Sequence, residues 1–355
     1  MTGPDRSDSN QAEAASSQPA QPADRMRFSL QSSHDPAVDQ IIDLDTPIAA
    51  AARAAVRSRL GPAEQFPRPA SCRVITVANQ KGGVGKTTTT VNMAVALARH
   101  GAKVLVVDLD PQGNTSTALG VEHHSGVANI YDVLIGHSTL AEVVAPTDGA
   151  PGLTCVPATI DLAGAEIELV SLVARETRLR RAIEAYRHAE GADLDYVLID
   201  CPPSLGLLTV NALVATTEVL IPIQCEYYAL EGLGQLLKNV DLIRGHLNPD
   251  LRVSTILLTM YDARTRLADQ VADEVRAHFG EIVLTALIPR SVKVSEAPGY
   301  GQSVITYDPA SRGAVAYIQA ARELATRGAA TTSEPDPGAA AILTRDVTQD
   351  TAGRA

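Results

Sequence analysis

The 355-residue chain has no tryptophan, only three phenylalanines and four cysteines, and it contains no long uninterrupted apolar run. A membrane-spanning helix needs about 20 predominantly apolar residues, so the sequence excludes a helix that spans a membrane. The four cysteines, Cys72, Cys155, Cys201 and Cys225, lie far apart without a C-x-x-C pair, which disfavours a disulfide framework or a zinc site. The first residues show no basic start followed by an apolar stretch, so we expect no secretory signal and a cytoplasmic protein.

Lysine is also scarce, with five lysines among 30 basic residues. The net charge of -11 argues against a protein that coats nucleic acid in bulk, although it leaves room for a local basic patch. Two of the five lysines, Lys81 and Lys86, lie in one glycine-rich segment. Where arginine is the default cation, a retained lysine suggests that the site needs a compact ammonium group.

Residues 1 to about 40 are rich in Ser, Gln, Ala, Pro and Asp with almost no apolar periodicity, and the tail TTSEPDPGAAAILTRDVTQDTAGRA also has the character of a disordered segment. We therefore expect disordered extensions over residues 1–70 and 329–355, and a globular domain over 71–328. Within the first extension, a capping Asp45, Pro47 and a terminal Gly61 mark a candidate short helix over 46–60. That helix is either transient or a docking element.

Between the extensions, apolar strands alternate with amphipathic helices. The expected strands cover 73–79, 103–110, 153–156, 195–200, 218–223, 252–260 and 281–289. The expected helices cover 86–100, 161–188, 206–216, 228–247, 265–279 and 311–327, with a loop-rich stretch after the second strand. This alternation predicts an α/β fold in which a doubly wound, mostly parallel sheet is covered by helices on both faces.

The segment that joins the first strand to the first helix has the character of a phosphate-binding loop. Glycines let backbone N–H groups curl around phosphate oxygens, and the helix N-terminus adds a positive partial charge. Lys86 would neutralise the β and γ phosphates, and the Thr87 hydroxyl would bind Mg²⁺. The usual pattern has a glycine where this chain has Gln80, and Lys81 is an additional lysine. The predicted nucleotide-binding residues are Lys81, Gly82, Gly83, Val84, Gly85, Lys86, Thr87 and Thr88.

This variant loop, NQKGGVGKTTTTVNMA, resembles the deviant Walker A box of the ParA/Soj group of partition ATPases, within the MinD-like class of P-loop NTPases. The resemblance covers residues 73–327. Five further segments carry it in the same order: VVDLDPQGNTSTALG (106–120), VLIDCPPSLG (197–206), LEGLGQL (230–236), LLTMYDART (257–265) and IPRSVKVSEAPGYG (288–301).

The resemblance implies catalytic roles for Lys81, Lys86 and Asp110, with ATP and Mg²⁺ as cofactors. Lys81 would reach across a homodimer to the partner's nucleotide, as an arginine finger does, and Gly82 would lie where the two subunits approach most closely. Asp110 would position the attacking water. Asp200, at the end of an apolar strand, would hold Mg²⁺ through water.

Simpler interpretations of three of these residues stay open. In one interpretation, Asp110 only caps the turn that begins with Pro111. Asp108 is expected to be structural or to support the Mg²⁺ network, and Cys201 to be a packing residue.

The resemblance also implies that the dimer binds duplex DNA without sequence preference through basic residues of the C-terminal half. Arg264, Arg290 and Lys293 are the leading candidates, with Arg244 and Arg266 as further ones; each could equally be a solvated surface residue. Asp241 replaces a basic residue that related proteins often have, which weakens the case for the 228–247 helix. A second basic surface is offered by Arg175, Arg178, Arg180, Arg181 and Arg187.

Together these features predict a slow, partner-stimulated ATPase associated with the nucleoid, which segregates a chromosome or plasmid with a ParB-like partner and without a membrane. An ATPase that positions another cargo, such as a flagellum or microcompartment, stays open. A MinD-like septum-site ATPase would need a basic amphipathic C-terminal helix, whereas this tail is Pro-interrupted and slightly acidic. A nitrogenase-iron-protein-like electron carrier would need a second cysteine near Cys201, and none lies at a convincing spacing. A plasmid-type autorepressor would need an N-terminal helix-turn-helix domain, and the extension has too few core residues to form one.

Overall fold

The computed structural model describes residues 64–189, 193–227 and 229–330. The candidate helix over 46–60 and almost all of the 329–355 tail lie outside these residues. Within the predicted 1–70 extension, residues 64–70 are described, and they pack on the domain. Phe66 is buried and stacks on His100 with ring centroids 3.9 Å apart. Packing against the domain therefore begins a few residues before the predicted boundary.

The described residues form one eight-stranded sheet in the order β3-β4-β2-β5-β1-β6-β7-β8. All neighbouring strands are parallel except β3 and β4, so the predicted doubly wound, mostly parallel sheet is confirmed. The strands are β1 (Arg73–Val77), β2 (Val104–Asp108), β3 (Ala145–Pro146), β4 (Leu153–Val156), β5 (Tyr196–Asp200), β6 (Glu218–Gln224), β7 (Arg252–Tyr261) and β8 (Val283–Pro289).

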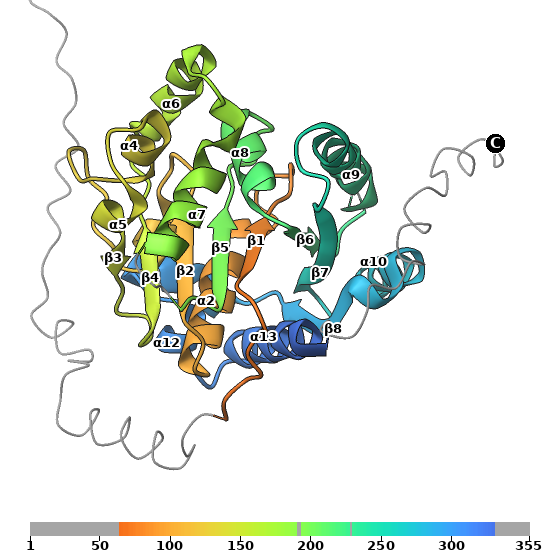
Figure 1. Cartoon of the computed structure of the whole chain (residues 1–355). Helices are drawn as coiled ribbons and strands as arrows, with labels where there is room; N and C mark the ends of the chain where they lie inside the picture. Colours follow the sequence, from red (N-terminus) through yellow and green to blue (C-terminus); the bar gives the residue numbers. More distant parts are fainter. Residues whose placement is uncertain (1–63, 190–192, 228, 331–355) are drawn as a thin grey trace, which may run out of the picture. The chain divides into compact units, whose positions relative to one another are not determined.

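Helices cover both faces of this sheet (Figure 1). The long ones are α2 (Lys86–Arg99), α7 (Arg178–Ala189), α8 (Leu207–Ala215), α9 (Ala229–His246), α10 (Arg266–Phe279) and α13 (Arg312–Ala330). The shorter ones are α3 (Asn114–Ala118), α4 (Ile130–Ile135), α5 (Leu140–Val143), α6 (Leu162–Glu168), α11 (Val292–Glu296) and α12 (Val304–Tyr307), with 3-10 turns η1 (Leu169–Ser171), η2 (Arg175–Thr177), η3 (Gly280–Ile282) and η4 (Ala297–Tyr300).

In the central strands, successive side chains point to opposite faces of the sheet and enter different hydrophobic cores. In β2, Val104 and Val106 pack with α2, α12 and α13, whereas Leu105 and Val107 pack with α4, α6, α7 and α8. A third core joins β6, β7 and β8 to α9 and α10. This period of two is what a buried strand imposes on its side chains. In the described part of the chain, no helix is both long and apolar enough to span a membrane.

The single helix predicted over 161–188 is wrong. The chain forms α6 and η1, becomes extended at Leu172, passes through a left-handed residue at Ala174 (φ 54°), and begins α7 separately. The cause lies on α8, where the Asn211 side chain donates to the Arg175 carbonyl at 2.9 Å and accepts from the Leu179 amide at 3.3 Å. These bonds occupy backbone groups at the start of α7 and fix a second helix start there.

The connectivity places several strand ends together. β1 lies between β5 and β6, and the chain leads from β1 to β2 on one side and later to β6 on the other. In register, Asp200 pairs with both Val77 and Asp108, so the last residues of β1, β5 and β2 are neighbours. Open α/β sheets bind ligands at such a switch point, outside the carboxyl ends of the strands.

Candidate nucleotide-binding site

The loop between β1 and α2 leaves the switch point and has the conformation that a phosphate-binding loop requires. Gly83 (φ 74°) and Gly85 (φ 91°) adopt left-handed backbone, and Gly85 caps the N-terminus of α2. A Cβ atom added at Gly82, Gly83 or Gly85 would meet no heavy atom within 4 Å, so this stretch of backbone is uncovered by the rest of the chain. Asn79 anchors the loop, because its side chain donates to the Pro222 carbonyl at 2.8 Å and accepts from the Lys81 amide at 3.0 Å.

The two loop lysines have different surroundings. Lys86 is the first residue of α2 and is only 7% exposed. Burial lowers its pKa, although Asp200, Cys201 and Asp110 oppose that shift. A buried ammonium group at the positive end of a helix is a site that favours an anion, which is what a phosphate supplies. Lys81 instead lies 3.5 Å from the Glu226 carboxylate, with its side chain 35% exposed.

Asp200 is the best-connected acid of the site. Its Oδ2 accepts hydrogen bonds from the hydroxyls of Thr87 at 2.7 Å and Thr115 at 2.8 Å, and its Oδ1 accepts from Thr90 at 3.4 Å. Complete burial raises its pKa to about 6, against the effect of the hydrogen bonds from Thr87 and Thr115. Mg²⁺ binds few protein oxygens and takes its remaining ligands from phosphate and water. The adjoining oxygens of Thr87 and Asp200 fit that requirement, and no cluster of three or more His, Cys, Asp or Glu in the described ranges offers an alternative metal site.

Asp108 anchors the loop that follows β2. It is fully buried, and its carboxylate accepts from the Asp110 amide at 3.2 Å and from both the amide and the hydroxyl of Ser116. Burial and the neighbouring charge of Asp200 raise its pKa to about 8. Asp108 therefore holds the loop between β2 and α3, which carries Asp110, against the end of the sheet.

Asp110 is almost buried at 8% exposure, and its Oδ1 accepts from the Gln112 amide at 3.0 Å. The capping role considered for this residue is thus present, and it leaves the second carboxylate oxygen for another partner. Asp110 also acts electrostatically on Lys86 and Asp200, so it belongs to the same site. Cys201 is fully buried in the second core, as expected of a packing residue.

Sequence reasoning missed three residues of the site. Thr115 and Thr90 bond Asp200, and Glu226 pairs with Lys81. The hydroxyl-rich run that follows Asp110 was a visible signal for Thr115. Nothing local pointed to Glu226, because it reaches the loop only through the pairing of β6 with β1.

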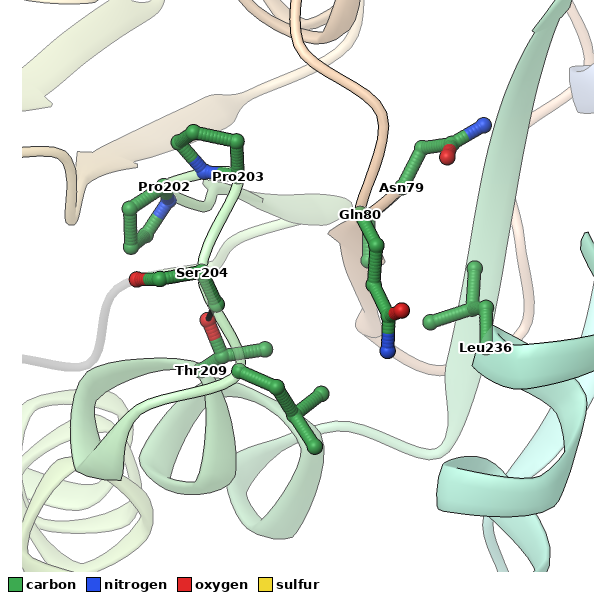
Figure 2. Close-up of a pocket in the computed structure, with 9 residues that line it drawn as sticks. Asn79, Gln80, Pro202, Pro203, Ser204, Thr209 and Leu236 are labelled. Atoms are coloured by element: carbon green, nitrogen blue, oxygen red, sulfur yellow. Dashed lines mark hydrogen bonds between the residues drawn. The ribbon is translucent and has the colours of Figure 1, made fainter. Parts of the chain in front are cut away.

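A small pocket lies beside the loop. Figure 2 shows the Gln80 side chain between the Pro202–Ser204 segment and Leu236 of α9. Leu205 and Thr209 also line it. Gln80, which replaces the usual glycine of the motif, thus faces the loop that follows β5.

The structure brings together only some of the predicted DNA-binding residues. Tyr261 at the end of β7 pairs with Pro289 at the end of β8, which sets the segment with Arg264 and Arg266 beside Arg290. Asp262 binds the exposed Arg264 side chain at 2.7 Å and also attracts Arg290.

Lys293 follows on α11, 3.2 Å from Glu296 and over the Tyr307 ring. Arg244 does not belong to this group. It lies in the last turn of α9, just before β7 begins, and therefore at the opposite end of the strands. It pairs with Asp241 at 2.9 Å. On the second basic surface, Arg175 and Arg178 donate to the carbonyls of Val170 and Leu134.

The doubly wound sheet, the glycine loop at its switch point and the buried lysine define a P-loop nucleotide-binding protein. Residues 72–253 match the family model described as an AAA domain. The chain is 52% identical to the sporulation initiation inhibitor protein Soj of Bacillus subtilis (strain 168), over 72% of this chain and 99% of that protein. It is 51% identical to the chromosome partitioning protein ParA of Caulobacter vibrioides (strain NA1000 / CB15N), over 72% of this chain and 94% of that protein. The chain belongs to the ParA/Soj family of chromosome-partitioning ATPases.

Solved structures agree with this assignment. A Mycobacterium smegmatis protein described as cobyrinic acid a,c-diamide synthase, with a bound ATP analogue and magnesium, is 39% identical with a TM-score of 0.62, over 72% of this chain and 94% of that one. The cell division ATPase MinD of Pyrococcus furiosus is 28% identical with a TM-score of 0.59, over 72% of this chain and 99% of that one. The relatives named above and the family model confirm the predicted membership in the ParA/Soj family.

Proposed function

We propose that this chain is an ATP-dependent, dimerising ATPase that holds DNA without sequence preference and segregates a chromosome or plasmid with a ParB-like partner. The observation that carries the proposal is the glycine loop, whose backbone is uncovered beside a buried Lys86 and a Thr87–Asp200 oxygen pair. Related structures were solved with an ATP analogue or ADP and magnesium, which supports the same cofactors here. Bound Mg²⁺ would neutralise charge on the β and γ phosphates.

In this proposal the loop residues 81–88 bind the phosphates through backbone N–H groups, and Lys86 supplies the compensating charge. Thr87 and Asp200 hold the metal, with Thr115 and Thr90 orienting the Asp200 carboxylate. Asp110 orients the attacking water with the oxygen that Gln112 does not occupy. Because hydrolysis then awaits a cation from a second subunit, turnover is slow until the dimer and its activator assemble.

The glycine at position 82 is evidence in favour of a dimer. Its φ lies outside the left-handed region, and an added Cβ would meet nothing within its own chain. The fold therefore gives no reason for a glycine at this position, whereas a second subunit approaching the loop closely would. Lys81 is its neighbour, with its side chain 35% exposed and held by one weak surface ion pair, so it can leave Glu226 for a partner's nucleotide at small cost.

DNA is the proposed ligand of the cluster formed by Arg264, Arg266, Arg290 and Lys293. Tyr261 and Pro289 pair at the ends of β7 and β8, and Asp262 interacts with both Arg264 and Arg290 there, so the position of these two cations also supports the proposal. Contacts of this type bind the phosphate backbone and carry no sequence code. Association with DNA would place the protein on the nucleoid, and ATP hydrolysis stimulated by the partner would release it.

The test is a Gly82→Val variant compared with Gly245→Val, a substitution at a glycine of α9 that likewise meets nothing within 4 Å. We expect Gly82→Val to bind ATP normally but to stay monomeric in sedimentation with Mg²⁺ and ATP, while Gly245→Val dimerises like the unchanged chain. Normal dimerisation of Gly82→Val would refute the face-to-face arrangement.

A further inference from the structure

Five large apolar side chains are exposed around α6 and the loop that follows β5. Ile160, Ile167, Val170 and Val173 are between 59% and 88% exposed, and Leu205 is 42% exposed. We call these five residues the apolar crest. The other exposed large apolar side chains of the described residues are spread over the β6–α9 loop, α9, α10, α11, η4 and α13. A concentrated apolar surface of this kind marks an interaction site.

The domain's own core does not use the crest. On α6 and η1, Leu162, Ala165 and Leu169 face inward and are fully buried in the second core. Ile167 and Val170 follow each other three residues apart on the opposite side of the same helical turn. Val173 lies between Leu172, where the chain becomes extended after η1, and the left-handed Ala174. Folding therefore leaves much of the surface of these side chains uncovered and available to a partner.

The crest lies at the same end of the sheet as the nucleotide site, at the carboxyl ends of the parallel strands. Ile160 follows the end of β4 and Leu205 follows the end of β5, and the phosphate loop leaves the end of the parallel strand β1 at the same edge. In Figure 1, α6 stands beyond the carboxyl ends of β4 and β5. Glu166 of α6 lies against Gly206, and the neighbouring Leu205 lines the same pocket as Gln80.

The charge around the crest indicates an apolar protein surface as its partner and disfavours DNA. Asp161 and Glu168 flank it, and Glu168 is held by the Tyr131 hydroxyl at 2.9 Å. The cation nearest to the crest, Arg175, donates to the Val170 carbonyl and is paired with Glu176 at 2.8 Å. Carboxylates repel the phosphate backbone. The candidate DNA-binding cations lie at the ends of β7 and β8, at the far side of the sheet from β4.

We propose that the crest is covered by a second copy of this chain and forms the apolar part of the dimer interface beside the two nucleotides. The inference rests on the proposed function, because that function brings a second copy against the phosphate loop. A copy that faces Gly82 also faces the surface that continues through Leu205 to α6. In a two-fold dimer both copies present the same surface, so each crest residue contributes twice. The apolar centre that such an interface needs is absent from the glycine loop itself and is supplied by the crest.

The test measures the dimer dissociation constant by sedimentation equilibrium with Mg²⁺ and a non-hydrolysable ATP analogue. We compare the unchanged chain, Ile167→Asp, Val173→Asp and the control Leu242→Asp, which changes a 60% exposed leucine in the last turns of α9. The crest variants are expected to weaken the dimer at least tenfold while binding the analogue as monomers with unchanged affinity. Leu242→Asp should dimerise normally. Ile167→Ser should give a smaller shift in the same direction, and the circular dichroism of every variant should match that of the unchanged chain.

Dimers of normal strength from both aspartate variants would overturn the inference. Normal dimers with loss of partner-stimulated hydrolysis alone would also overturn it, and would assign the crest to the activator instead. If the unchanged chain itself stays monomeric with the analogue, the proposed function fails together with the inference. If the unchanged chain dimerises and the crest variants dimerise equally well, the inference fails and the proposed function stands.

Discussion

The buried pair formed by Asp108 and Asp200 should make the stability of the nucleotide-free protein depend on pH. The two residues are opposite each other in the β2–β5 pairing, and burial with the neighbouring carboxylate raises the pKa of Asp108 from 3.8 to about 8. Between these values the folded state keeps a proton that the unfolded chain has lost. Stability therefore falls as pH rises through this window.

The size of the change in unfolding free energy follows from the one proton that the folded state retains. A single retained proton corresponds to about 1.4 kcal/mol per pH unit, and the slope decreases as pH approaches the pKa, so the folded state loses on the order of 2 kcal/mol between pH 6 and pH 8. Asp200 contributes mainly below this range, because its pKa is raised only to about 6. The range from pH 6 to 8 thus isolates Asp108.

The assay is urea unfolding at several pH values without nucleotide, on the unchanged chain, Asp108→Asn and Asp193→Asn. Asp108→Asn should flatten the slope of unfolding free energy against pH by about 1.4 kcal/mol per unit, whatever its effect on absolute stability. Asp193 is exposed and pairs with Lys103, so its variant should keep the original slope. An unchanged slope in Asp108→Asn would show that the carboxyl group is not protonated in the fold.

Substitutions of the two loop lysines and of the candidate DNA-binding cations test their individual roles. Lys86→Ala should abolish nucleotide binding or reduce hydrolysis at least about 100-fold, because no other buried cation of the loop replaces it; normal turnover would refute the phosphate-loop assignment. Lys81→Ala should keep ATP bound, as measured by nucleotide titration, but lose dimer-dependent hydrolysis, and unchanged activity would contradict a role across the interface. Charge reversal at Arg264 or Lys293 should weaken binding to duplexes of every sequence and reduce the salt dependence by roughly one contact. A changed sequence preference would indicate a different kind of DNA contact.

The strands and the phosphate loop were predictable because their signals are local. The apolar run over 153–156 coincides with β4, and the glycines and lysines of the loop lie within one short segment between β1 and α2. A local pattern could not show the break between α6 and α7, since Asn211 of a later helix fixes it. The stretch after the second strand was expected to be loop, yet it contains α3, α4 and α5, which are too short for periodicity to detect.

Long-range contacts were also invisible. The neighbourhood of Arg264 and Arg290 depends on the register of Tyr261 with Pro289, and the Thr115–Asp200 bond joins residues 85 positions apart. Likewise, the sequence could not show that Arg244 lies apart from the other candidate DNA-binding residues, because this depends on where α9 ends and β7 begins. Residue type suggested these candidates, but only the pairing of strands decided which of them lie together.

The central claim is a nucleotide-controlled dimer that binds DNA, and sedimentation of an Asp110→Ala variant tests it most directly. The variant keeps the loop, Lys86 and the Thr87–Asp200 pair but lacks the proposed water-positioning carboxylate, so bound ATP should persist. The account predicts a monomer without ATP, and a dimer with Mg²⁺ and ATP that co-sediments with random-sequence duplex DNA at low salt. A monomer that ignores both ATP and DNA would contradict it, and would favour an ATPase of the same fold that positions another cargo.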